Sequence, residues 1–119
     1  GLSSTEEPDL LQRSLDGILL SWIEVGEPSA ERVRKASTVA KQVKVYCFNT
    51  KANVWWSQAK TEIENCGAQV YQFQWEQIDA LAGLVKRTLA LSVTITGMTA
   101  FIAANSGSVE VAWTELTNT

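Results

Sequence analysis

One stretch of eight residues, Ile18 to Val25, constrains the fold more than any other part of the chain. Its side chains are mostly apolar on both faces of an extended backbone, which is typical of a strand in the interior of a sheet. Gly17 precedes it in a turn where a positive φ is expected, and Gly26-Glu27-Pro28 ends it. The rest of the chain must therefore build a sheet around this strand.

The surrounding pattern alternates between strands and helices. A short strand is expected over residues 9–13, and Ser29 fits the N-cap of a helix that reaches about Gln42. Further elements are expected over 43–48 (strand), 54–65 (helix), 68–73 (strand), 75–85 (helix) and three β-rich runs, 89–96, 99–104 and 109–114. We predict one α/β domain over residues 1–119, a mixed sheet flanked by helices with a C-terminal antiparallel β meander.

Composition removes several kinds of chemistry. The 119 residues contain no histidine, which excludes Ser-His-Asp and Cys-His nucleophiles and nearly every zinc or copper site. No apolar run is long enough to cross a membrane, so no membrane partner is expected. Cys47 and Cys66 are interpreted as buried free thiols in a reducing compartment rather than as a disulfide.

The charge is unevenly distributed along the chain. The net charge is −3, which argues against nucleic-acid binding by bulk electrostatics. Residues 32–44 nevertheless carry five bases and no acid. This Arg32–Lys44 segment, most of it in the expected helix, is the candidate surface for nucleic acid.

Glu24 is the residue that points to a site, because a carboxylate near the end of an apolar strand is costly unless it is paired or bound. Asp16 would sit at the opposite end of the same strand, roughly 26 Å away. A hairpin centred between residues 16 and 17 instead pairs positions that sum to 33, which sets Asp9 opposite Glu24.

Two carboxylates this close repel one another unless a cation or a base lies between them. Their oxygens suit Mg²⁺ or Mn²⁺, with Asp9 and Glu24 as the ligands. The alternative is a solvent-facing Asp9 beside a structural Glu24–Arg32 ion pair. Arg32 falls on the same helix face as Val33, Ala36, Val39 and Ala40, which helical geometry predicts to be the buried face.

Lys35 lies on the flank of this helix and either reaches the same cleft or remains a solvated surface lysine. Trp55 and Trp56 raise the possibility of base stacking. Because adjacent helical side chains diverge by about 100°, we expect one tryptophan to pack on the sheet and the other at an edge.

These residues resemble known patterns. Fourteen residues separate Pro8-Asp9 from Glu24-Val25-Gly26, which looks like the PD-(D/E)XK nuclease motif with its last lysine replaced. More specifically, the chain is similar to the YaeQ family in Glu7-Pro8-Asp9-Leu10, Trp22-Ile23-Glu24-Val25-Gly26-Glu27-Pro28, Arg32, Lys35-Ala36, Val54-Trp55-Trp56 and Val109-Glu110-Val111.

The resemblance implies a restriction-endonuclease-like core in a bacterial cytoplasmic protein of unsettled function. It also implies an N-terminal strand and helix that this chain does not contain, so the chain is expected to be the C-terminal portion of a longer YaeQ-like domain. In a metal-dependent phosphodiesterase or nuclease site, Asp9, Glu24 and the Val25 carbonyl would hold the metal, and Lys35 or Arg32 would replace the motif lysine. The alternative is a catalytically silent fold that binds nucleic acid or protein.

Overall fold

The computed structural model describes residues 7–50, 52–88 and 90–117 of the chain. The elements follow one another as strands and helices in the order that the sequence predicts. They are β1 (Leu10–Arg13), β2 (Leu19–Val25), α1 (Ala30–Val39), β3 (Gln42–Phe48), α2 (Ala52–Asn65), β4 (Gln69–Phe73), α3 (Trp75–Lys86), β5 (Ser92–Thr96), β6 (Thr99–Ala104) and β7 (Gly107–Glu115).

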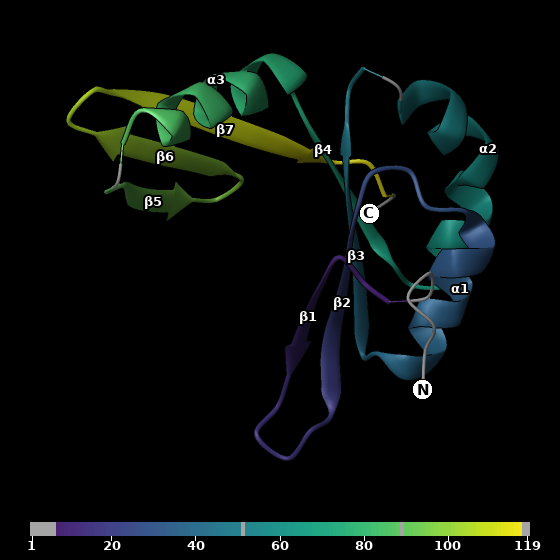
Figure 1. Cartoon of the computed structure of the whole chain (residues 1–119). Helices are drawn as coiled ribbons and strands as arrows, with labels where there is room; N and C mark the ends of the chain where they lie inside the picture. Colours follow the sequence, from purple (N-terminus) through teal and green to yellow (C-terminus); the bar gives the residue numbers. More distant parts are fainter. Residues whose placement is uncertain (1–6, 51, 89, 118–119) are drawn as a thin grey trace.

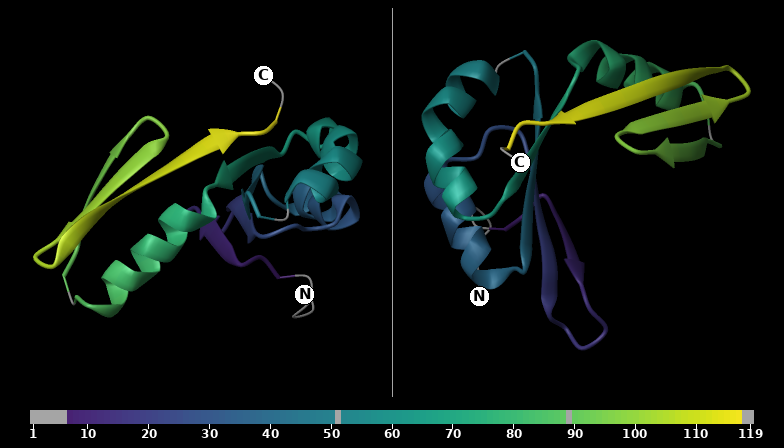
Figure 2. Two further views of the ribbon diagram at one scale, coloured as in Figure 1. Left: turned by 90° about the horizontal axis from the view of Figure 1, so that it is seen from above. Right: turned by 180° about the vertical axis from the view of Figure 1, so that it is seen from behind.

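The strands form one mixed, curled sheet in the order β1-β2-β3-β4-β7-β6-β5. The neighbours β2, β3 and β4 run parallel, and every other pair in the sheet is antiparallel. Figure 1 shows α1 and α2 together on one side of β2–β4, while β5–β7 and α3 extend away from them. Figure 2 gives two further views of this arrangement. The expected mixed sheet, flanking helices and terminal meander are therefore confirmed.

The larger hydrophobic core lies between the parallel strands and the first two helices. It consists of alternate residues of the strands and one face of each helix: Trp22, Val43, Val45, Cys47, Val70, Val33, Ala36, Ala52, Ala59 and Ile63, together with Ala68. Trp55 and Trp56 both pack against this core while partly exposed, with ring centroids 5.6 Å apart. The expected division into one core and one edge tryptophan is therefore wrong.

A smaller core lies under α3. Leu84 of the helix packs with Ile102 of β6 and Val111 of β7, and all three are buried. The two cores meet where β4 pairs with β7, at Phe73 and Trp113. The C-terminal strands β5–β7 thus join the rest of the sheet through the short ladder between β4 and β7.

The hairpin of β1 and β2 has the predicted register at its open end. Leu10 pairs with Ile23 and Leu11 with Trp22, and both pairs sum to 33. A bulge then shifts the pairing near the turn, between Gln12 and Arg13, which the sequence does not reveal. The turn itself contains Gly17 at φ +87°, as predicted.

The first helix is shorter than predicted. It begins after the Ser29 cap as expected, but it ends at Val39, and Ala40 is already extended. Lys41 then donates its backbone N–H to the Leu19 carbonyl, and β3 starts at Gln42. Val39, expected on the buried face, is the last residue of the helix and is 48% exposed.

The two cysteines differ, although both are free. Cys47 is fully buried on β3, and this burial raises the pKa of its thiol to about 11. Cys66, just after α2, is only half-buried, which corrects the expectation that both thiols are enclosed.

We expect a thiol reagent to distinguish these two cysteines at pH 8. Cys66 should react quickly in the folded chain, while Cys47 should react at least about 100-fold more slowly, because its thiolate fraction is about 0.1% and its sulfur is enclosed. Timed labelling followed by mass spectrometry measures both rates, and Cys66→Ser should abolish the fast phase. Equal labelling rates for the two thiols would contradict the buried position of Cys47.

Candidate metal centre

The candidate site lies at the open end of the β1–β2 hairpin. Glu24 is the last buried residue of β2, and the ladder that ends at Leu10–Ile23 places Asp9 at the next register position, opposite Glu24. The Asp9 carboxylate reaches across this mouth, where its Oδ2 accepts a hydrogen bond from the Val25 N–H at 2.7 Å. The structure therefore brings both predicted acidic residues to the same end of the hairpin.

The Glu24 carboxylate is held from two sides. The residue is only 4% exposed, and its Oε1 accepts hydrogen bonds from Arg32 Nε at 2.5 Å and from Trp22 Nε1 at 2.9 Å. These contacts satisfy a buried charge that would otherwise be costly. The Glu24–Arg32 ion pair that the sequence left as one alternative is present.

Arg32 connects three segments of the chain. Besides the ion pair, its Nη2 donates to the backbone carbonyl of Glu7, and its guanidinium lies 6.0 Å from the centre of the Trp22 ring. Ser29 fixes the helix turn that carries Arg32, because its Oγ accepts a hydrogen bond from the Arg32 backbone N–H at 3.1 Å. Arg32 thus joins the entrance to β1, the end of β2 and the start of α1.

Each carboxylate uses only one of its oxygens for these contacts. Both hydrogen bonds to Glu24 end on Oε1, and no enclosed side-chain oxygen in the described part of the chain lacks a partner, so Oε2 keeps contact with solvent. Asp9 is exposed and uses Oδ2 for its bond to Val25. Among the described residues, the hydrogen bonds to each acid thus end on one of its two oxygens.

Lys35 and Gly26 concern the expected replacement of a motif lysine. The Lys35 ammonium pairs with Glu31 at 3.5 Å on the exposed side of α1, and both side chains are more than half exposed. Gly26 has φ +116°, a backbone conformation that side-chain-bearing residues rarely adopt, although the space around it is open. Of the two predicted replacements, the structure brings Arg32 to Glu24 and directs Lys35 elsewhere.

The basic segment spans more than one element. The helix α1 carries Arg32, Arg34 and Lys35, and Arg32 is engaged with Glu24. Because α1 ends at Val39, Lys41 lies in the connection to β3 rather than in the helix, where it was expected. Lys44 lies within β3, as expected.

Trp22 is the site residue that the sequence analysis missed. A signal for it exists, because residues two apart on a strand share one face and the Trp22 indole can therefore reach the Glu24 carboxylate. The backbone carbonyl of Glu7 could not have been found, since it depends on the path of the chain before β1.

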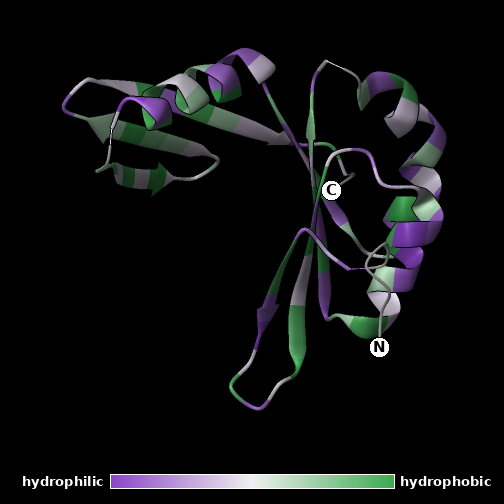
Figure 3. Ribbon diagram, in the orientation of Figure 1, coloured by the Kyte–Doolittle hydropathy of each residue, from purple (hydrophilic) through white to green (hydrophobic). Residues whose placement is uncertain are grey.

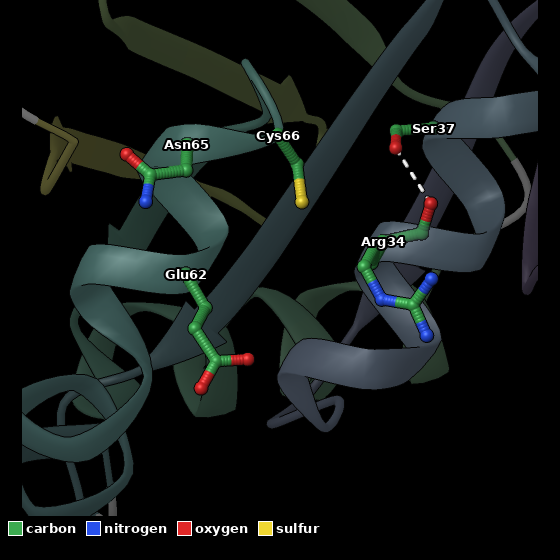
Figure 4. Close-up of a pocket in the computed structure, with 5 residues that line it drawn as sticks. All are labelled: Arg34, Ser37, Glu62, Asn65 and Cys66. Carbon is green, nitrogen blue, oxygen red and sulfur yellow. Dashed lines mark hydrogen bonds between the residues drawn. The ribbon is translucent and has the colours of Figure 1, made fainter.

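A second depression lies between α1 and α2, away from this site. It is lined by Arg34, Ser37, Glu62, Asn65 and Cys66. Figure 4 shows the Cys66 thiol directed into the space between the two helices, with Arg34 and Glu62 on either side. None of these residues belongs to the hairpin mouth.

Two features of the described residues concern the predicted ligands and partners. Residues 7–50, 52–88 and 90–117 contain no group of three or more acidic, histidine or cysteine side chains that could hold a metal. A cation at the hairpin mouth would thus depend on two carboxylates, main-chain oxygen and water. In the same ranges, no helix is long and apolar enough to cross a bilayer.

Fold and site together define a mixed α/β protein with an acidic pair and a partly exposed arginine at the mouth of its first hairpin. The family model described as "YaeQ protein" matches residues 1–113. The chain therefore belongs to the YaeQ family.

Individual relatives agree with this assignment. The chain is 28% identical over 113 residues to the "Uncharacterized protein YaeQ" of Escherichia coli K12, covering 93% of this chain and 62% of that protein. The "Uncharacterized protein YaeQ" of Salmonella typhi is 31% identical over 97 residues, which cover 80% of this chain and 54% of that protein. The chain thus spans about three-fifths of the length of such relatives.

Crystal structures of YaeQ proteins share this fold. The one from Xanthomonas axonopodis pv. citri matches with a TM-score of 0.86 at 27% identity, covering all of this chain and 68% of that one. The one from Pseudomonas syringae gives 0.85 at 29% identity, covering all of this chain and 66% of that one.

Proposed function

We propose that the hairpin mouth is a divalent-cation site of a phosphodiesterase or nuclease-like hydrolase. The observation that carries this proposal is the pattern of hydrogen bonds to the two carboxylates. Asp9 and Glu24 are each oriented by hydrogen bonds to one oxygen, which leaves the other oxygen of each for a cation. Such bonds to one side of a ligand carboxylate are typical of metal centres, because they orient the ligand.

The donor set suits a hard cation. Carboxylate oxygens with water and a main-chain carbonyl, for which Val25 is the candidate, match the preferences of Mg²⁺ and Mn²⁺. Bound there, the cation would lower the pKa of a water molecule and stabilise charge on a phosphate oxygen. The PD-(D/E)XK pattern in Asp9, Glu24 and Val25 supports the same chemistry and a restriction-endonuclease-like core, as does the resemblance that carries it.

Arg32 acts in this proposal mainly as a positioning residue. Its guanidinium holds Glu24 Oε1 and partly neutralises the acidic pair, which lowers the cost of placing two carboxylates side by side. With 28% of its side chain exposed, it also presents positive charge to an incoming phosphate. Lys35 remains a candidate for that second task only if it leaves Glu31.

A titration with MnCl₂ or MgCl₂ tests cation binding directly. At about ten times the dissociation constant, the wild type should gain about 1.4 kcal/mol in unfolding free energy. Its Tm should then rise by a few degrees. Asp9→Asn and Glu24→Gln should each remove the shift, because each neutralises one ligand. Asp79→Asn, which removes an exposed acid on α3, should leave it intact.

Turnover is measured with the same variants. In the presence of Mn²⁺ the wild type should hydrolyse an activated phosphodiester such as bis(p-nitrophenyl) phosphate, and Asp9→Asn should reduce the rate at least about 100-fold. An equal thermal shift in the wild type and both site variants, or no shift in any of them, would refute the site.

A catalytically silent binding module is the second candidate. It is favoured by the absence of a side chain at Gly26 and by the pairing of Lys35 with Glu31, which together leave the motif lysine without a close replacement. Such a module would bind nucleic acid or protein without turnover. Cation binding that is lost in Asp9→Asn, with no hydrolysis by the wild type, is the result expected for it.

Two further assignments belong to this proposal. The free thiols Cys47 and Cys66 support a reducing, cytoplasmic environment. The resemblance supports one domain that continues, in the relatives, beyond the part matched by this chain.

A further inference from the structure

Two hydrogen-bond donors converge on one oxygen of the Glu24 carboxylate. The Trp22 indole Nε1 donates to Oε1 at 2.9 Å, and Arg32 Nε donates to the same oxygen at 2.5 Å. A carboxylate oxygen has about two lone-pair sites, so these two donors occupy the accepting sites of Oε1. A cation that meets Glu24 is therefore directed to the other oxygen, Oε2.

The Trp22 indole is held in place by the sheet. Trp22 and Glu24 lie two residues apart on β2, so their side chains share one face of the strand. The strand begins in strongly hydrophobic residues (Figure 3), and Trp22 is paired to Leu11 on one side and to Val43 on the other. Since Trp22 is only 3% exposed, its ring cannot turn away from the carboxylate without disturbing the close-packed core.

The two donors also support one another. The Arg32 guanidinium lies 6.0 Å from the centre of the Trp22 ring, and the Ser29 cap fixes the helix turn that carries Arg32. Trp22 and Glu24 are already buried against the core of this chain. Their contact therefore does not require any segment beyond the chain, and it does not depend on what covers the outer surface.

The number of carboxylate oxygens that can bind affects the choice of cation. Ca²⁺ takes about six to eight oxygen ligands and often uses both oxygens of one carboxylate. Mg²⁺ and Mn²⁺ prefer an octahedron of oxygens, in which a carboxylate supplies one ligand and water supplies several. With Glu24 restricted to Oε2, the hairpin mouth offers Ca²⁺ one ligand fewer, while the smaller cations lose nothing.

We propose that Trp22 is a specificity-determining residue of the cation site at the hairpin mouth. Together with Arg32 it restricts Glu24 to coordination through Oε2, which disfavours Ca²⁺ relative to Mn²⁺ and Mg²⁺. Trp22 does not touch the cation in this arrangement, and it acts through the Glu24 carboxylate as a positioning residue. The inference rests on the proposed function, since it requires a cation between Asp9 and Glu24.

Competition between two cations tests the role of Trp22. The chain is loaded with MnCl₂, free Mn²⁺ is measured by its electron paramagnetic resonance signal, and CaCl₂ is added to displace the bound ion. In the wild type, Mn²⁺ should bind more tightly than Ca²⁺. Trp22→Phe keeps an aromatic ring but frees an accepting site on Oε1. The ratio of the Ca²⁺ to the Mn²⁺ dissociation constant should therefore fall about 5-fold, the typical effect of one hydrogen bond.

Trp56→Phe is the matched control. It makes the same substitution at a tryptophan of α2 that packs against the same core, whereas the donors to Glu24 in the described part of the chain are Trp22 and Arg32. The ratio of the two dissociation constants should equal that of the wild type. A general loss of packing weakens the binding of both cations alike, so this ratio separates positioning from damage to the fold.

A crystal of the wild type grown with MnCl₂ supplies a measurement that does not depend on the folding of a variant. It should show Glu24 bound to the ion through Oε2 alone. An unchanged ratio in Trp22→Phe, or a Glu24 bound through both oxygens, would overturn the role of Trp22 and leave the cation site intact. No Mn²⁺ binding by the wild type, or equal binding by Asp9→Asn, would refute the site itself and the inference with it.

Discussion

Replacing Arg32 with methionine is expected to destabilise the chain by about 3 kcal/mol. The substitution keeps most of the apolar stem but removes the guanidinium from Glu24, whose side chain is only 5% exposed. A buried charge that loses its partner costs about 3–5 kcal/mol, and the partial exposure of Arg32 places this pair at the lower end. Urea unfolding measures the change in free energy.

A matched control exists on the same helix. Lys35→Met removes a similar charge from an exposed ion pair with Glu31, and it should change the unfolding free energy by no more than about 0.5 kcal/mol. Combining Arg32→Met with Glu24→Gln should restore part of the lost unfolding free energy, because the double variant has no unpaired carboxylate. Equal, small effects of the two methionine substitutions would contradict a buried pair.

Arg32→Met also distinguishes a purely structural ion pair from a metal site. Without Arg32, the two carboxylates lose the nearest positive charge, so Mn²⁺ should stabilise Arg32→Met more than it stabilises the wild type. A purely structural pair predicts no such gain. Unfolding measured with and without the cation gives this difference directly.

Gly26→Lys, which introduces the lysine that the resemblance to the PD-(D/E)XK motif would place there, is expected to destabilise the chain by about 1–3 kcal/mol. The cost comes from the backbone, since Gly26 has φ +116° and a Cβ added there would meet no atom within 4 Å outside its chain neighbours. Gly26→Ala should therefore cost about as much as Gly26→Lys. Thermal and urea unfolding of both variants check this equality.

Gly83 provides the contrasting control. It lies inside α3, and an added Cβ would meet only the flexible end of Arg87 at 3.4 Å. Gly83→Ala should stabilise the chain by about 0.5–1 kcal/mol through helix propensity. A neutral Gly26→Ala substitution would contradict this account and show that the strand end does not require glycine.

The hairpin mouth could be predicted because local chemistry determines it. Gly17 indicates the turn, and the apolar run after it indicates the second strand of the hairpin. Because paired positions sum to 33, the register predicts that Asp9 lies opposite Glu24. The side of the helix that carries Arg32 followed from helical geometry after Ser29 was identified as the cap. Each of these steps depends on residues that are close in sequence or paired by one turn.

The errors arise where distant contacts outweigh local preference. Ala40, Lys41 and Gln42 are acceptable helix formers, yet they leave the helix because Lys41 and Gln42 join the ladder beside Leu19 and Ser21. The bulge in the hairpin and the conformation of Gly26 also depend on tertiary packing. Lys41 of the basic segment lies outside the helix for the same reason.

Asp9 and Glu24 are proposed to share one divalent cation at the hairpin mouth. Crystals grown with MnCl₂ and measured for anomalous scattering at the manganese edge would reveal such an ion. We expect a single strong peak within coordination distance, about 2.0–2.3 Å, of one oxygen from each carboxylate. Crystals without a peak there, or with a peak that touches only one of the two acids, would rule out a shared cation.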